Sequence, residues 1–258
     1  MMKIYAYVEK GMGKTECQDR VLVGDTILAG GFLTMEYTGE QNLLVAIADG
    51  VGGYPGGEKA SLLAVDSIRV LNRRTNLVEE DIRALMERTN MQIKKTGQMN
   101  PGYESMATTM TALVMNKEKA VVIHIGNCRL YSGKNFMAPL TKDQTVVAEM
   151  VDRGEMTKEE ALESPIRNQI NACLGGNAEG LFNKLRVETR DNIPEQDDNL
   201  LLTCDGIHDY LNMDELEDML GKGTDAKTVC EGIAGLAREK GSADDISIII
   251  VDRLGKYQ

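Results

Sequence analysis

Three short apolar runs that each meet an aspartate constrain the fold most strongly. Asp49 follows LLVAIA, Asp205 follows LLLTC, and Asp244 lies just before ISIIIV. Runs of this length, rich in branched apolar side chains and bounded by turn residues, are typical of buried strands. The sequence therefore predicts three buried strands with a carboxylate at one end of each.

A carboxylate at a strand end has a defined chemical use, because the sheet holds it rigidly while it faces the open edge. Three such ends that meet would give a hard divalent cation a set of oxygen ligands. Gly50 and Gly206 follow two of the aspartates, permit sharp turns, and let the Gly50 carbonyl approach a metal. A single Asp-Gly pair more often forms a turn, so spacing alone leaves a turn role and a metal role open.

Helices are expected after the glycine-rich stretch Val51–Gly57. Apolar residues recur every three or four positions over Glu58–Arg73 and again over Val78–Lys95, which predicts two amphipathic helices. Mixed strands with inserted pairs of helices indicate an α+β domain whose helices cover the sheet faces. Further strands are predicted over Thr108–Met115, Ala120–Ile125 and Arg129–Ser132, as one antiparallel meander, and over Leu185–Thr189, and further helices over Val146–Arg153, Lys158–Leu162, Asp214–Leu220 and Ala226–Glu239.

Composition limits the classes of function. A chain of 258 residues with 42% hydrophobic residues suits a single domain, residues 1–258. The net charge of -11 disfavours nucleic acid and anionic membranes, which attract cationic proteins. We find no signal segment, no apolar run near the roughly 20 residues that span a bilayer, and five scattered cysteines without metal or disulfide spacing. The sequence predicts a cytoplasmic protein.

Seven segments, in order along the chain, resemble the motifs of the metal-dependent protein serine/threonine phosphatases of the protein phosphatase 2C type. Together they cover nearly the whole chain, although each motif alone is weak. They are Thr15–Arg20 (TECQDR), Val45–Gly53 (VAIADGVGG) with Gly57–Ser61 (GEKAS), Met106–Thr109 (MATT), His124–Tyr131 (HIGNCRLY), Leu140–Asp143 (LTKD), Leu200–Asp209 (LLLTCDGIHD) and Gly241–Ile250 (GSADDISIII).

The resemblance implies a four-layer αββα sandwich, in which two packed antiparallel sheets are flanked by antiparallel helix pairs. It also implies two divalent ions, Mg or Mn, at one edge of the sandwich. Asp49 would bridge both ions, Gly50 would offer its carbonyl, and Asp205 and Asp244 would complete the shell of the first ion. Asp19 matches a carboxylate that orients metal-bound water.

The activity implied is hydrolysis of phosphoserine and phosphothreonine on proteins by a metal-activated water, without a phosphoenzyme. The partners implied are phosphorylated proteins and a cognate serine/threonine kinase, with neither nucleic acid nor a membrane involved. The physiological substrate, the choice between Mg and Mn, and the oligomeric state are not set by the sequence.

Four positions depart from the family pattern. Gln18 replaces a glutamate that serves the second ion, which should then bind more weakly, and Lys14 replaces the phosphate-contacting arginine, giving charge without a bidentate fork. Asn127 replaces an aspartate of an additional metal site, and Val51 stands where some relatives place a proton-donating histidine. These changes keep two alternatives open: a degenerate phosphatase domain that binds a partner, and a phosphohydrolase of small metabolites.

Overall fold

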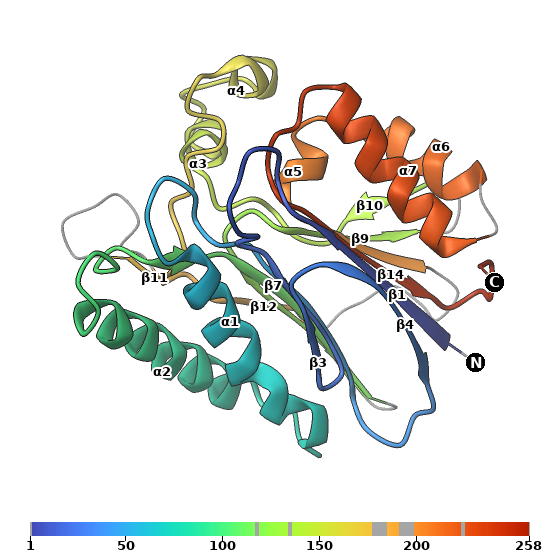
Figure 1. The fold of residues 1–258 in the computed structure, drawn as a ribbon, viewed down its shortest axis with the longest axis horizontal. Coiled ribbons are helices and arrows are strands. Elements are labelled where there is room, and N and C mark those ends of the chain that lie inside the picture. The colour runs from blue at the N-terminus through green and yellow to red at the C-terminus, as the bar shows by residue number, and fades with distance from the viewer. Residues whose placement is uncertain are drawn as a thin grey trace.

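The computed structural model describes residues 2–116, 119–133, 136–176, 185–190, 199–222 and 225–257. Within these residues, two six-stranded antiparallel sheets pack face to face and helices cover both outer faces (Figure 1). This arrangement confirms the αββα sandwich that the sequence resemblance implies.

In the first sheet, the first and last strands of the chain are neighbours. In the first sheet β1 and β14 pair side by side near the centre, with Tyr5 opposite Ile250. Its order is β10 (Ala138–Pro139), β9 (Arg129–Gly133), β13 (Asn199–Thr203), β14 (Ile246–Asp252), β1 (Met2–Glu9) and β4 (Gly31–Tyr37). The second sheet has the order β12 (Glu188–Arg190), β8 (Ala120–Ile125), β7 (Met110–Met115), β5 (Leu43–Ala48), β2 (Arg20–Val23) and β3 (Thr26–Leu28), and β6 (Ala107–Thr108) pairs with β11 (Leu174–Gly175).

Strand β5 shows why the central strands are apolar at every position. Leu43, Val45 and Ile47 pack between the sheets, whereas Leu44 and Ala46 pack against the helices on the other face. Successive strand residues point to opposite faces, so a strand covered on both sides needs a continuous apolar run. The run in β14 follows the same rule.

Each sheet has its own helical cover. Helices α1 (Gly57–Ile68) and α2 (Glu79–Gln98), joined by the 3₁₀ helix Arg69–Arg73, cover the second sheet, and α6 (Met213–Lys222) and α7 (Ala226–Glu239) cover the first (Figure 1). Short helices α3 (Val146–Asp152) and α4 (Lys158–Glu163) project from the end of the sandwich near α5 (Asp205–His208). Nearly all the predicted helix bounds agree with these to within a few residues.

The predicted meander is wrong in its third strand. β7 and β8 pair as expected, but β9 belongs to the other sheet, where it pairs with β13. The chain crosses between the sheets at Gly126, whose φ of 104° and close contact with Thr109 suit only glycine. Sequence patterns missed β1 to β4, and Leu185–Thr189 is strand only from Glu188 onward.

In the part of the chain that the structure describes, no helix is both long and apolar enough to cross a bilayer.

Candidate functional site

Four aspartates meet at one end of the sandwich, and we call Asp19, Asp49, Asp205 and Asp244 the acidic cluster. Asp19 and Asp49 extend the paired ends of β2 and β5, where Arg20 lies opposite Ala48. The carboxyl groups of Asp49 and Asp205 are close enough to hydrogen-bond, and both interact electrostatically with Asp244. The structure therefore brings together the three strand-end carboxylates on which the sequence prediction depends.

The electrostatics of this cluster favour cation binding. Burial, opposed in part by the Ser247 hydrogen bond and reinforced by the other aspartates, raises the pKa of Asp19 to about 7. Burial first, and then repulsion from Asp205, raises the pKa of Asp49 well above its ordinary value, and the pKa of Asp205 is raised as well. Divalent cations would remove this repulsion, and carboxylate oxygens are the ligands that Mg²⁺ and Mn²⁺ prefer.

Asp19 joins the two sheets at the cluster and has one oxygen to spare. Its side chain is fully buried, and its Oδ2 accepts a hydrogen bond of 2.6 Å from the Ser247 hydroxyl of β14. Its Oδ1 is buried without a hydrogen-bond partner among the described residues. A buried carboxylate oxygen needs a donor or a cation, so this atom fits the predicted role of holding a metal-bound water.

The loop after β5 is held from its backbone, which leaves the Asp49 side chain free to face the cluster. The Asp49 carbonyl accepts hydrogen bonds from the Thr109 amide and the Thr108 hydroxyl, each at 2.8 Å. Gly50 packs so closely on Gly57 that an added Cβ would lie 2.5 Å from the Gly57 backbone. Only glycine fits at position 50, so its predicted metal-facing carbonyl is placed by main-chain packing.

Gln18 lies beside this loop. Its carbonyl accepts hydrogen bonds from the Gly50 amide at 3.2 Å and from the Ser61 hydroxyl at 2.6 Å, and its side-chain amide lies against Gly57. The predicted ligand is thus a neutral amide next to Gly50. That a second ion binds more weakly because of it stays a prediction.

Asn127 and Val51 are both uncharged side chains next to the site. The Asn127 amide donates a hydrogen bond of 3.0 Å to Asp205. Val51 packs against the small apolar group of Ala107, Ile170 and Cys173 and offers no proton. Neither residue adds a carboxylate or an acid to the site.

Lys14 lies at the rim of the cluster, where its ammonium forms ion pairs with Asp244 and, at 3.0 Å, with Asp245. Burial alone would lower the pKa of Lys14, but these two carboxylates raise it overall, so the side chain stays charged. Its predicted contact with phosphate is untested, although a fixed cation beside the cluster is compatible with it.

Three residues that support the site were not predicted: Ser247, Thr108 and Asp245. The double acid Asp244-Asp245 is visible in the sequence, but only the fold shows that the second carboxylate turns inward. Among the described residues, no three or more acidic, His or Cys side chains stand in an arrangement that could hold a metal ion together. The metal and catalytic roles assigned above therefore stay predictions.

The contact between Ser247 and Asp19 gives a first prediction. Ser247→Ala should lower kcat about tenfold while KM changes less than about threefold, because a loosened carboxylate orients water poorly. Steady-state kinetics on a phosphopeptide checks this, with Ser247→Thr as the matched control that keeps the hydroxyl. Equal kcat for the alanine variant and the unaltered protein would contradict the assigned role of Asp19.

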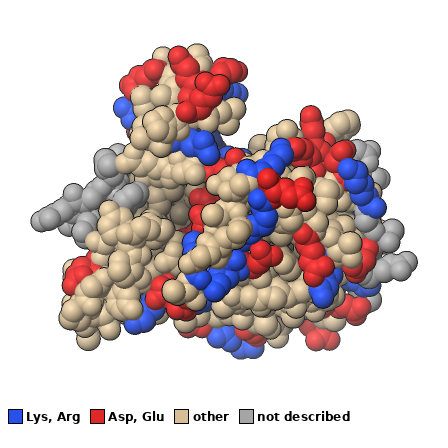
Figure 2. Space-filling view, turned by 45° about the horizontal axis from the view of Figure 1, so that its top comes forward, with Lys and Arg blue, Asp and Glu red and all other residues tan. Residues whose placement is uncertain are grey.

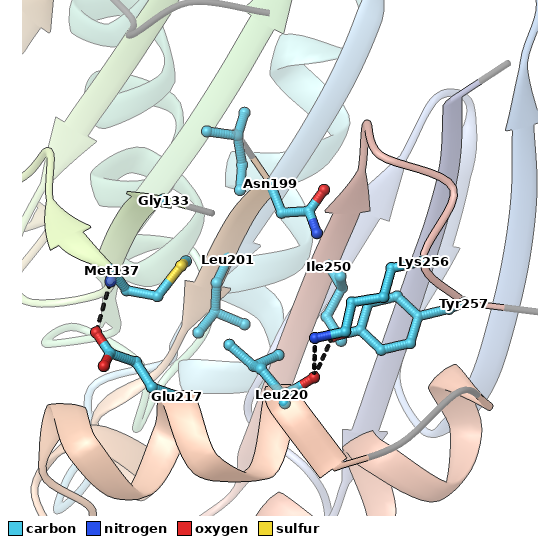
Figure 3. A pocket seen from close by; sticks show the side chains of 11 residues that line it. Gly133, Met137, Asn199, Leu201, Glu217, Leu220, Ile250, Lys256 and Tyr257 are labelled. Carbon is cyan, nitrogen blue, oxygen red and sulfur yellow. Dashed lines mark hydrogen bonds between the residues drawn. The ribbon is translucent and has the colours of Figure 1, made fainter. Parts of the chain in front are cut away.

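A separate cavity of about 180 Å³ lies between α6 and the first sheet, at the opposite end of β13 and β14 from the acidic cluster. Figure 3 shows Glu217 accepting a hydrogen bond of 2.6 Å from the Met137 amide, while Lys256 and Tyr257 donate to the Leu220 carbonyl. These polar groups already bond to one another, so we do not place the active site here.

One face of the molecule is hollowed (Figure 2). Figure 2 shows acidic atoms in the hollow between the projecting α3–α4 segment and the main body, with basic atoms along one side.

The chain as a whole is similar to known protein phosphatases. The family model for protein phosphatase 2C matches residues 15–239. A serine/threonine phosphatase stp of Listeria welshimeri is 29% identical over 217 residues, which cover 81% of this chain and 84% of the relative. The protein phosphatase PhpP of Streptococcus pneumoniae is 29% identical over 215 residues, which cover 81% of this chain and 85% of the relative.

Solved structures of phosphatases are also similar to this chain over nearly its whole length. The serine/threonine phosphatase PstP/Ppp of Mycobacterium tuberculosis superposes with a TM-score of 0.80 at 25% identity, over 98% of this chain and 99% of that one. A catalytic domain of PstP in complex with two manganese ions superposes with a TM-score of 0.73 at 25% identity, over 98% and 99% of the two chains. The chain belongs to the protein phosphatase 2C family of metal-dependent protein serine/threonine phosphatases.

Proposed function

We propose that this chain hydrolyses phosphoserine and phosphothreonine esters on cytoplasmic proteins. The observation that carries the proposal is the acidic cluster, in which side chains from both sheets meet beside a fixed lysine. The stp and PstP relatives, which are named serine/threonine phosphatases, support the same substrate class. A serine/threonine kinase of the same cell would supply the phosphorylated substrates.

The residues divide the work as follows. Asp49, Asp205 and Asp244, with the Gly50 carbonyl, would hold two divalent cations, which supply a water of lowered pKa and neutralise charge on the phosphoryl oxygens. Asp19 would accept a hydrogen bond from the attacking water at its unpaired Oδ1. Every one of these groups acts without forming a covalent bond to phosphorus.

Lys14 would receive the phosphate at the rim of the cluster. Its charge is maintained by the two ion pairs described above, and an ammonium neutralises phosphate oxygens as a point charge. The leaving alcohol would take its proton from water or from a residue other than Val51 and His124, because Val51 offers none and the ring nitrogens of His124 already bond to Thr111 and the Lys142 carbonyl.

The test is release of phosphate from a phosphothreonine peptide with Mn²⁺ and with EDTA. We expect turnover only with the metal, and faster turnover on the peptide than on a panel of sugar and nucleotide phosphates. A folded protein that binds Mn²⁺ without turnover would instead be the degenerate binding domain. Faster hydrolysis of a small metabolite would indicate the other alternative.

A further inference from the structure

Asp245 is a buried carboxylate whose every contact reaches the loop over residues 11–18. Its side chain is 1% exposed. Its Oδ1 accepts a hydrogen bond of 2.7 Å from the Gly11 amide, and its Oδ2 accepts from the Gln18 amide at 2.8 Å and the Lys14 ammonium at 3.0 Å. A buried charge is tolerated only when it is paired and hydrogen-bonded in this way.

The two carboxylates that hold Lys14 differ in what else they can do. Asp244 is 48% exposed and belongs to the acidic cluster, so a bound cation would compete with Lys14 for it. Asp245 faces inward, and its oxygens are fully used by this loop. It therefore remains an anchor for the ammonium whether or not Asp244 carries a metal.

A second clamp holds the same two segments from outside. Arg238 of α7 donates hydrogen bonds to the carbonyls of Asp244 at 2.6 Å, Ser242 at 3.0 Å and Lys10 at 3.2 Å. These contacts are with the main chain, so they hold the loops together without fixing where the Lys14 side chain lies. Asparagine at position 245 would lose the hydrogen bond from the Gly11 or the Gln18 amide, but the Arg238 contacts should keep the two segments together while the ammonium is released.

We propose that Asp245 is a positioning residue of the phosphatase, which fixes the Lys14 ammonium beside the acidic cluster so that it meets the incoming phosphate. The proposal rests on the proposed phosphate contact of Lys14. It assigns Asp245 no contact with metal or substrate, because its carboxylate is closed off by Gly11, Gln18 and Lys14.

The experiment measures equilibrium binding of inorganic phosphate to the Mn²⁺-loaded protein by calorimetry. The variants are Asp245→Asn, which keeps the shape and removes the charge, Lys14→Ala, and the double variant. Asp252→Asn is the matched control, since Asp252 is a buried carboxylate at the far end of β14 that accepts backbone amides of residues 254, 256 and 257. Mn²⁺ affinity and thermal unfolding are measured for each.

We expect Asp245→Asn and Lys14→Ala each to weaken phosphate binding about tenfold, and the double variant to be no worse than Lys14→Ala by more than about twofold. Mn²⁺ affinity should stay within about threefold, and Asp252→Asn should lower only the unfolding temperature. If Asp245→Asn does not fold, Asp245→Ser, which leaves room for water, replaces it in the series.

Three results would overturn the proposal. The first is that Asp245→Asn binds phosphate as well as the Asp252→Asn control does. The second is that Asp245→Asn weakens phosphate binding by the same factor in the protein with Lys14 and in the Lys14→Ala variant. A Lys14→Ala variant that binds phosphate normally would reject the lysine contact itself, and the inference with it, while hydrolysis at the acidic cluster would still stand.

Discussion

Replacing Asp49 by asparagine should abolish turnover and yet make the metal-free protein more stable. The carboxylate is the one expected to bridge two cations, so kcat/KM should fall by at least about 10⁴-fold, equivalent to roughly 5.5 kcal/mol of transition-state stabilisation. The gain in stability follows because burial and repulsion from Asp205 raise the pKa of Asp49 well above its ordinary value. A neutral amide of the same shape removes both penalties.

The measurements are phosphopeptide kinetics with Mn²⁺ and thermal unfolding in EDTA. Asp252→Asn again serves as the control, because it should lose stability and keep its activity: its carboxylate satisfies the Tyr257 amide at 2.9 Å. An Asp49→Asn protein that hydrolyses the phosphopeptide at the normal rate would contradict the metal role assigned to the acidic cluster. So would one whose unfolding temperature in EDTA is below that of the unaltered protein.

Metal removal should reverse the pH dependence of stability. In the metal-free protein the pKa of Asp19 is about 7, against about 4 in an unfolded chain, and Asp49 and Asp205 are raised in the same direction. A raised carboxyl pKa means that the folded state binds protons more tightly, so this contribution is complete below about pH 4 and is lost as pH rises through 7. For Asp19 alone the loss is on the order of 4 kcal/mol.

Thermal unfolding between pH 5 and pH 8 checks this expectation. In EDTA the unfolding temperature should fall as pH rises, and Asp209, whose pKa burial raises to about 7, adds to the same trend. With Mn²⁺ present the charged carboxylates are favoured, so the metal should stabilise the protein more at pH 8 than at pH 5. An identical pH profile with and without Mn²⁺ would show that the cluster does not bind the ion.

Local sequence patterns predicted elements well where one physical rule dominated. The sequence predicts a helix over Ala226–Glu239 and a strand over Ala120–Ile125, which are the observed bounds of α7 and β8. Apolar residues that recur with helical period indicate the first, and a nearly continuous apolar run indicates the second. β4 was missed because its residues alternate between partly buried and exposed at a sheet edge, which gives a weak apolar signal. The family resemblance supplied the sandwich that these patterns alone did not.

The sequence by itself determined the strand-end aspartates and, through its motifs, the family. Both signals come from residues that are adjacent in the chain, so they can be seen in the sequence without knowledge of the fold. Only the tertiary structure decided that β9 crosses to the other sheet, that Ser247 holds Asp19, and that Asp245 turns inward to Lys14 while its neighbour Asp244 faces outward. These contacts join residues that are at least 66 positions apart, as Asn199 and Gly133 are, and pairing across such distances is set by packing of the whole sandwich.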